Sequence, residues 1–101
     1  MKTLLIDTRE SNKATIGLRL NNKLISKTVN KKINSQVVLP LIEKILRENK
    51  LVVWDIDEIE VFQGPGSFTG LRVGVAIANA LSAALNIKVN GSKKPVEAVY
   101  K

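Results

Sequence analysis

The stretch GPGSFTGLR, residues 64–72, joins an expected strand to an expected long helix and sets the architecture around it. Residues 56–62, which precede it, alternate as a half-buried strand does. Pro65 fixes its own φ and Gly66 tolerates a left-handed backbone, so the pair predicts a sharp strand-to-helix turn. Ser67 is placed to cap the helix by accepting a hydrogen bond from an early backbone N–H. We therefore expect a structural turn that fixes where the helix begins.

A glycine-rich loop before a helix can also bind phosphate, so its spacing has to be compared with the motifs that do so. A P-loop requires Gly where this chain has Thr69 and a Lys directly after it, and Arg72 does not replace that Lys. The dinucleotide fingerprint also requires Gly at Thr69. The esterase elbow requires Gly where the chain has Pro65. All three motifs are excluded by specific residues, although anion binding stays open as an alternative.

Small residues recur every four positions along the helix expected at residues 67–85. They are Gly70, Gly74, Ala78 and Ser82. Glycine inside a helix costs about 1 kcal/mol relative to alanine, so the stripe indicates that another backbone approaches closely. Apolar side chains flank it at Val73, Ile77, Ala80, Leu81 and Ala84. Two interpretations are open: packing on the chain's own sheet, or contact with a second protein.

Hydrophobic periodicity predicts one further helix and four further strands. The helix begins at Ser35, which can cap it, and runs to about Asn49, with a kink at Pro40. Asn86 can end the long helix, and Pro95 can begin a final short helical segment. The expected strands cover residues 4–6, 15–20, 23–29 and 87–89. The order β-β-β-α-β-α-β predicts an α/β fold, a mixed sheet with helices packed on it.

The composition indicates one compact domain of 101 residues with an aliphatic core, because aromatic residues make up only 4% of the chain. The sequence has no Cys and no His, which excludes disulfides, thiolate zinc sites and Ser-His triads. We expect no catalytic residue, no metal and no cofactor. The first residues lack a signal-peptide pattern and the long helix contains a charged residue, so we expect a cytoplasmic protein without a membrane span.

The net charge of +7 is unevenly distributed, since residues 1–32 contain eight basic and two acidic side chains. Such a segment is compatible with RNA or an acidic partner, and equally with a well-solvated surface. Polar candidates for a site are fewer. Asp7 and Thr8 lie at the end of the first strand, where they can serve an anion, a metal or a turn. The acidic residues Asp55, Asp57, Glu58 and Glu60 indicate a solvated edge, with divalent-ion binding as the alternative, and Trp54 is expected to anchor packing.

The longer stretch GPGSFTGLRVG, residues 64–74, resembles the signature of the TsaB (YeaZ) family. The resemblance extends to residues 6–8, 35–36, 39–40 and 55–59. It implies a single lobe of the actin-like ATPase (ribonuclease H-like) fold, similar in fold to the catalytic subunit TsaD. The family normally has two lobes, so residues 1–101 are expected to form the N-terminal lobe alone, as a fragment or as a short form.

The resemblance also implies a function: a non-catalytic scaffold or activator subunit that pairs with a TsaD-like subunit in the threonylcarbamoylation of adenosine 37 in tRNA. The family pairs through two helices of this lobe, here residues 35–49 and 67–85, and we expect a homodimer when the chain is alone. The expected partner interface consists of Leu41, Ile45, Gly70, Val73, Gly74, Ile77, Ala78, Leu81 and Ser82.

Two departures from the family pattern bear on nucleotide binding. Asn34 stands where the family often has His, and Arg9-Glu10 follow the Asp-Thr pair where small hydroxyl residues are usual. Both argue against a nucleotide or metal role. The alternative function is the nucleotide- or phosphate-binding half of a split actin-like enzyme, using Asp7, Thr8 and Ser67. A weak or indirect tRNA contact through the basic N-terminal third is a further possibility.

Overall fold

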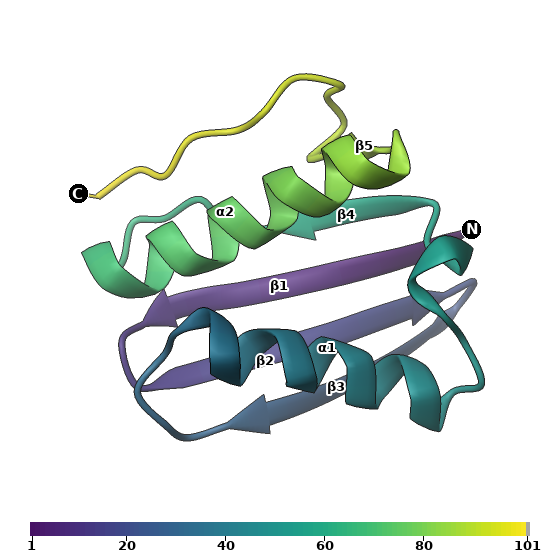
Figure 1. The fold of residues 1–101 in the computed structure, drawn as a ribbon, viewed down its shortest axis with the longest axis horizontal. Coiled ribbons are helices and arrows are strands. Elements are labelled where there is room, and N and C mark those ends of the chain that lie inside the picture. The colour runs from purple at the N-terminus through teal and green to yellow at the C-terminus, as the bar shows by residue number, and fades with distance from the viewer. Residues whose placement is uncertain (101) are drawn as a thin grey trace.

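The computed structural model describes residues 1–100, which form one five-stranded sheet and two helices (Figure 1). A short 3-10 turn, Val53–Asp55, precedes the fourth strand. The element order agrees with the order expected from the sequence. In chain order the elements are β1 (Lys2–Glu10), β2 (Lys13–Leu20), β3 (Lys23–Val29), α1 (Ser35–Glu48), β4 (Glu58–Val61), α2 (Phe68–Leu85) and β5 (Lys88–Val89).

The sheet is mixed, with strand order β3-β2-β1-β4-β5. Strands β1, β2 and β3 form an antiparallel meander, and β4 and β5 add to it in parallel on the other side of β1. Strand β1 is longer than expected and ends at Glu10, because it stays paired with β2 up to Lys13. Asp7 and Thr8 therefore lie inside a strand, and the expectation that they lie at its end was wrong.

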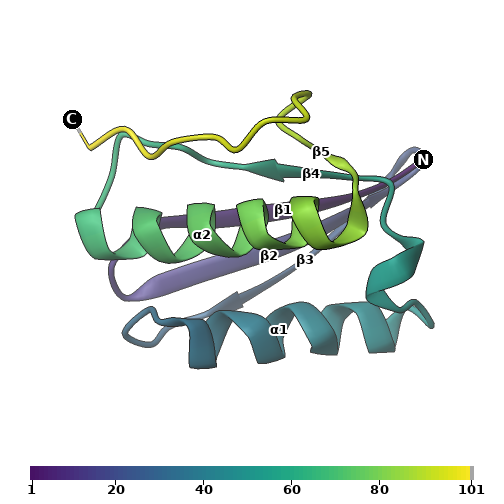
Figure 2. The same cartoon turned by 45° about the horizontal axis from the view of Figure 1, so that its top comes forward.

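Both helices pack on the same face of the sheet (Figures 1 and 2). Helix α2 covers β1 and β4, and α1 covers β2 and β3. The core between the layers is aliphatic, and its fully buried members include Leu4, Ile6, Ile16, Leu18 and Ile59. Trp54 is 75% exposed, so the expectation that it anchors packing was wrong.

The opposite face of the sheet, called here the open face, is finished with polar pairs. The Arg19 guanidinium donates to both carboxylate oxygens of Glu60, at 3.0 and 3.1 Å. The hydroxyls of Thr15 and Thr28 share a hydrogen bond of 2.8 Å across β2 and β3. One solvated face is usual for a sheet with antiparallel strands. The chain therefore has two broad surfaces: the open face of the sheet and the outward side of the two helices.

Helix ends confirm some of the expected caps and correct others. Ser67 caps α2 by accepting a hydrogen bond from the backbone of Gly70, and Asn86 ends it in the left-handed conformation, both as expected. Asn34, not Ser35, caps α1, because it has the extended backbone of an N-cap and its side chain accepts from the backbone N–H of Val37. The sequence alone does not show which of two adjacent cap-forming residues accepts the hydrogen bond.

Two further local expectations were wrong. In the glycine stretch the positive φ belongs to Gly64, at 126°, and not to Gly66, and the Gly64–Pro65 peptide bond is cis. No helix begins at Pro95, since residues 95–100 run extended along α2. The side chain of Asn79 bonds the backbone there, in place of the bonds that a helix would form.

Candidate functional site

The stripe of small residues on α2 faces the chain's own sheet. Thr8 is fully buried on β1, and its hydroxyl donates to the carbonyl oxygen of Gly70 at 2.6 Å. A Cβ at Gly70 would lie 2.8 Å from the carbonyl oxygen of Glu10 and still closer to that of Thr8, while one at Gly74 would overlap the Thr8 side chain. The glycines are thus explained by the close approach of α2 to β1, which is the intramolecular interpretation.

Most of the expected partner interface is buried within the chain, while contact with a partner stays a prediction. Six of its members are buried within the lobe: Ile45, Gly70, Gly74, Ile77, Ala78 and Ser82. The other three are half-buried at the edges of the helices: Leu41, Val73 and Leu81. The period-four pattern correctly predicted that another part of a protein approaches α2 closely. It does not indicate whether that neighbour belongs to the same chain or to a partner.

The outward side of the helix pair is nevertheless apolar and uneven. Ala76 and Ala80 are exposed on α2, and Leu39 of α1 is 48% exposed. A shallow hollow of about 480 Å³ lies near the first turns of both helices, lined by Asn34, Ser35, Thr69, Arg72, Val73, Ala76 and Ile77. A second, of about 510 Å³, lies near their ends, lined by Leu39, Ile42, Glu43, Leu46, Arg47, Leu51, Val52, Val53 and Leu81. We call this surface, with both hollows, the helix-pair face.

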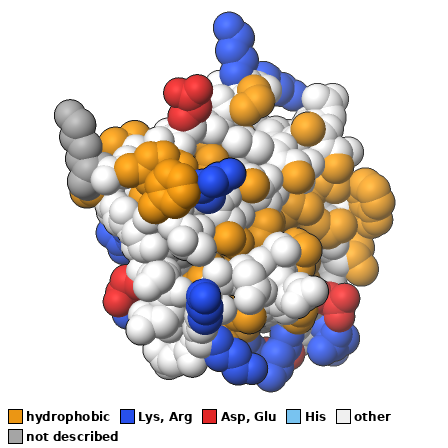
Figure 3. All heavy atoms as spheres, turned by 60° about the vertical axis from the view of Figure 1, so that its left-hand side comes forward, with side chains coloured by type: hydrophobic (Ala, Val, Ile, Leu, Met, Phe, Trp, Pro, Cys, Tyr) orange, Lys and Arg blue, Asp and Glu red, His pale blue; other side chains and the backbone are white. Residues whose placement is uncertain are grey.

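An aromatic corner adjoins the first hollow. The rings of Phe68 and Tyr100 lie 4.7 Å apart, and the Arg72 guanidinium sits 5.2 Å from the centre of the Phe68 ring. Both aromatic side chains are about half exposed. Figure 3 shows hydrophobic side chains in a broad band across this side of the molecule, with basic side chains along one edge. Sequence analysis did not single out this corner, because 32 positions separate Phe68 from Tyr100 and no periodicity links them.

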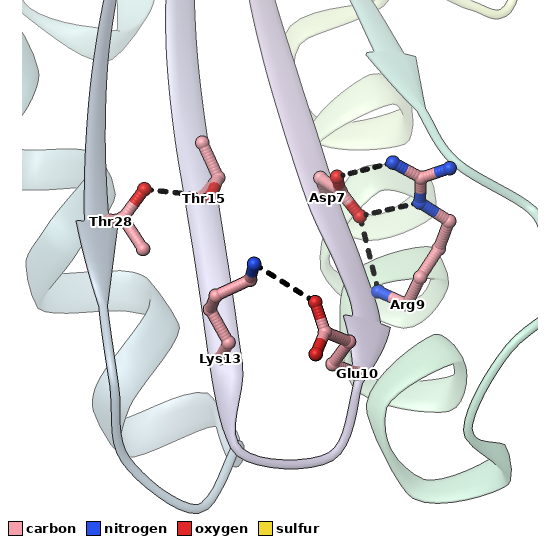
Figure 4. Close-up of polar contacts among 6 residues, drawn as sticks. All are labelled: Asp7, Arg9, Glu10, Lys13, Thr15 and Thr28. Atoms are coloured by element: carbon pink, nitrogen blue, oxygen red, sulfur yellow. Dashed lines mark hydrogen bonds and ion pairs between the residues drawn. The ribbon is translucent and has the colours of Figure 1, made fainter.

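The three anion candidates do not form an open anion site. Thr8 is buried and bonded to Gly70, and Ser67 is used as the cap of α2. The Asp7 carboxylate accepts from the Arg9 side chain at 3.0 and 2.9 Å (Figure 4). Beside this pair lies a polar hollow of about 360 Å³, lined by Asp7, Arg9, Glu10, Lys13, Thr15 and Pro65. Its charges already pair with one another, since Lys13 contacts Glu10 at 3.0 Å.

The Asp7–Arg9 pair sets the pKa of Asp7. Partial burial acts to raise this pKa, but the hydrogen bonds from Arg9 and the positive charges of Arg9 and Lys13 together outweigh it. The pKa therefore lies below its ordinary value of 3.8. Because the folded state holds the carboxylate ionised, the pair stabilises the fold above about pH 4 and loses its effect as the pH falls through the lowered pKa.

Asp7→Asn tests this pair. At neutral pH the variant should be less stable by up to about 1 kcal/mol, since Arg9 is exposed and surface pairs are weak. The difference from the wild type should begin to shrink near pH 4, where the carboxylate of the unfolded chain becomes protonated, and should shrink further as the pH falls through the lowered pKa of the folded state. Urea unfolding at a series of pH values measures it. A difference that stays constant down to pH 2 would show that the pair does not control the pKa of Asp7.

Three acidic residues before and within β4 have structural partners. Asp57 accepts from the backbone N–H of Lys2 at 2.7 Å, Asp55 accepts from that of Val52 at 2.9 Å, and Glu60 is paired with Arg19. No group of three or more His, Cys, Asp or Glu side chains able to hold a metal ion occurs within residues 1–100. Helix α2 is long and apolar enough to cross a membrane by length and composition alone, a test that core helices also pass.

Comparison with known proteins identifies this arrangement. The chain matches the family model described as TsaD, tRNA N6-adenosine threonylcarbamoyltransferase, over residues 25–92, a range that contains both helices. It is 32% identical over 94 residues to the tRNA threonylcarbamoyladenosine biosynthesis protein TsaB of Bacillus subtilis, covering 89% of this chain and 40% of the relative. The chain belongs to this TsaD-type family, as a TsaB (YeaZ) member. TsaB of Escherichia coli is 34% identical over 58 residues, which cover 57% of this chain and 25% of that protein.

The solved structures agree with the TsaB assignment. YeaZ from Pseudomonas aeruginosa superposes with a TM-score of 0.82 at 25% identity, covering 99% of this chain and 45% of that one. The actin-like fold expected from the resemblance is therefore confirmed. The chain spans less than half the length of these TsaB and YeaZ relatives.

Proposed function

We propose that this chain is a non-catalytic scaffold or activator subunit that binds a TsaD-like catalytic subunit in the threonylcarbamoylation of adenosine 37 in tRNA. The observation that carries the proposal is the helix-pair face, where α1 and α2 expose small and apolar side chains such as Ala76, Ala80 and Leu39. Small residues let a second pair of helices approach closely, and larger ones at the edges fill its hollows.

The family match supports a TsaD-like partner. Residues 25–92 match a model of TsaD itself, so a TsaD-like protein has counterparts of both α1 and α2. Two related helix pairs can stack about an approximate two-fold axis, as in an isologous dimer. The same face would then serve self-pairing when the TsaD-like subunit is absent, which is the basis for proposing a homodimer. Since tRNA modification is a cytoplasmic process, we propose that location too.

A catalytic role for the chain alone has less support. A second solved structure, with a TM-score of 0.80, is described as an uncharacterized protein similar to peptidase YeaZ. This sequence has neither Cys nor His for a thiol or His-ligated zinc protease. We propose that residues 1–101 form a single lobe, and the relatives' other half is what would complete an interlobe cleft.

The alternative is the nucleotide-binding half of a split enzyme, and the polar hollow beside Asp7 is the observation in its favour. Light scattering and calorimetry separate the two. If the chain is a scaffold, light scattering should show the mass of a 1:1 complex when a TsaD-like subunit is added. Calorimetry on the chain alone should show no saturable heat when ATP and magnesium are added. Saturable ATP binding without complex formation would overturn it in favour of the alternative.

A further inference from the structure

Residues 95–100, called here the C-terminal strap, lie extended against α2 and run back toward the beginning of that helix (Figures 1 and 2). The strap contains no helix or strand, yet Val96 and Ala98 are half-buried against the core. An extended segment can remain in place only if its backbone groups find partners. The partners are two amide side chains and one carbonyl group of the lobe.

Asn79 of α2 grips the strap through its backbone. Its Nδ2 donates to the carbonyl oxygen of Val96 at 2.9 Å, and its Oδ1 accepts from the N–H of the same residue at 2.9 Å. This is the reciprocal pair of bonds that one strand residue offers another across an antiparallel ladder. Because both bonds go to the main chain, the grip does not depend on which side chain stands at position 96.

Gln63, just before the glycine stretch, provides a second grip. Its carbonyl oxygen accepts from the N–H of Val99 at 2.6 Å, and its Nε2 donates to the carbonyl oxygen of Glu97 at 2.8 Å. The side-chain oxygen of Gln63 is in turn held by Asn90 at 2.9 Å. These contacts fix the strap over the loop that precedes α2.

Gly64 leaves the room that the strap needs. A Cβ at this position would lie 3.0 Å from the carbonyl carbon of Val99, and closer still to its oxygen. The next residue, Tyr100, places its ring against Phe68, and the Arg72 guanidinium lies over the same Phe68 ring. The strap therefore ends by completing the aromatic corner of the helix-pair face.

We infer that the strap is a working part of the partner surface, and that Asn79 is the positioning residue that delivers Tyr100 to it. The inference rests on the proposed function, since its partner is the same TsaD-like subunit. Tyr and Arg are among the side chains that most often dominate binding at interfaces, and here Tyr100 and Arg72 both lie against the Phe68 ring, beside a hollow that Arg72 lines. The side chain of Tyr100 is about half exposed, so packing alone holds it weakly. The hydrogen bonds to the strap backbone therefore keep Tyr100 in this position.

Asn79→Ala tests the grip in the free chain. Hydrogen exchange should show the amide of Val96 protected in the wild type and unprotected in the variant, with Val99 losing protection as well because the strap detaches. Asn79→Asp should keep the acceptor for the Val96 N–H and lose the donor to its carbonyl, so Val96 should retain part of its protection. Ala80→Ser, at the next and exposed position, is the matched control and should change neither amide. Unaltered protection in Asn79→Ala would overturn the inference.

Binding to the TsaD-like subunit tests the consequence. Asn79→Ala and Tyr100→Ala should each weaken binding about tenfold, and the double variant should weaken it no further, because both remove the same ring from the corner. If Asn79→Ala does not fold, Tyr100→Ala on the exposed strap still decides the question. Wild-type affinity in Tyr100→Ala, with Ala76→Arg failing to bind, would overturn the inference and leave the proposed function standing. Wild-type affinity in Ala76→Arg as well would overturn both.

Discussion

Gly70→Ala is expected to destabilise the lobe by about 3 kcal/mol, although alanine is the better helix former. The added Cβ would lie 2.8 Å from the carbonyl oxygen of Glu10 and closer still to that of Thr8, so α2 or β1 has to shift. That shift also strains the hydrogen bond from Thr8 to Gly70, whose groups are buried. Urea unfolding should show a lower midpoint with an unchanged slope.

The sign of the Gly70 effect is its most informative feature. If the stripe of small residues were open to solvent or to a partner, alanine would stabilise the helix by about 1 kcal/mol. Ala80→Gly, at an exposed position of the same helix, is the control and should cost about 1 kcal/mol through helix propensity alone. A more stable Gly70→Ala variant would contradict the packing of α2 on β1 described above.

Ala76→Arg is expected to weaken binding of a TsaD-like subunit on the order of 100-fold while leaving the fold intact. Ala76 is exposed in the middle of α2 and lines one of the two hollows, so a long charged side chain there keeps a second helix pair away. Arginine is a good helix former, and the free lobe should retain its stability. Titration calorimetry against the TsaD-like subunit measures the affinity.

The control for Ala76→Arg is Ser26→Arg, which adds the same charge on the open face of the sheet. Ser26 is exposed on β3, opposite Gly17 in the register and away from both helices. It should bind as the wild type does, apart from a small effect of the added charge that salt removes. Equal loss in both variants would assign the effect to net charge and not to the helix-pair face.

Much of the fold follows from local patterns. The strand expected at residues 23–29 matches β3 at both ends, and alternation before the glycine stretch identifies the inward side chains of β4, Ile59 and Val61. Ser67 and Asn86 mark the ends of α2 because each has one chemical role that suits its position. Strand β1 was underestimated, since its last residues are held by pairing with β2, a long-range contact that hydrophobicity does not report.

The site was only partly predictable, for the same physical reason. A stripe of small residues such as Gly70 and Gly74 indicates that a neighbour lies close, but not which residue that neighbour is. Only the three-dimensional arrangement shows that the neighbour is Thr8. The strap depends on an Asn side chain that bonds a backbone 17 residues away. No sequence pattern at Pro95 or Asn79 indicates that contact. A helical segment was therefore expected where an extended segment lies.

Site-directed cross-linking tests the helix-pair face most directly, because it locates the partner on the surface of the chain. The chain has no Cys, so Ala80→Cys on α2 and Ser26→Cys on the open face each give one attachment point for a photoactivatable group. With a TsaD-like subunit present, we expect efficient cross-linking from position 80 and none above background from position 26. Cross-linking from position 26 alone would contradict it and would place the partner on the open face of the sheet.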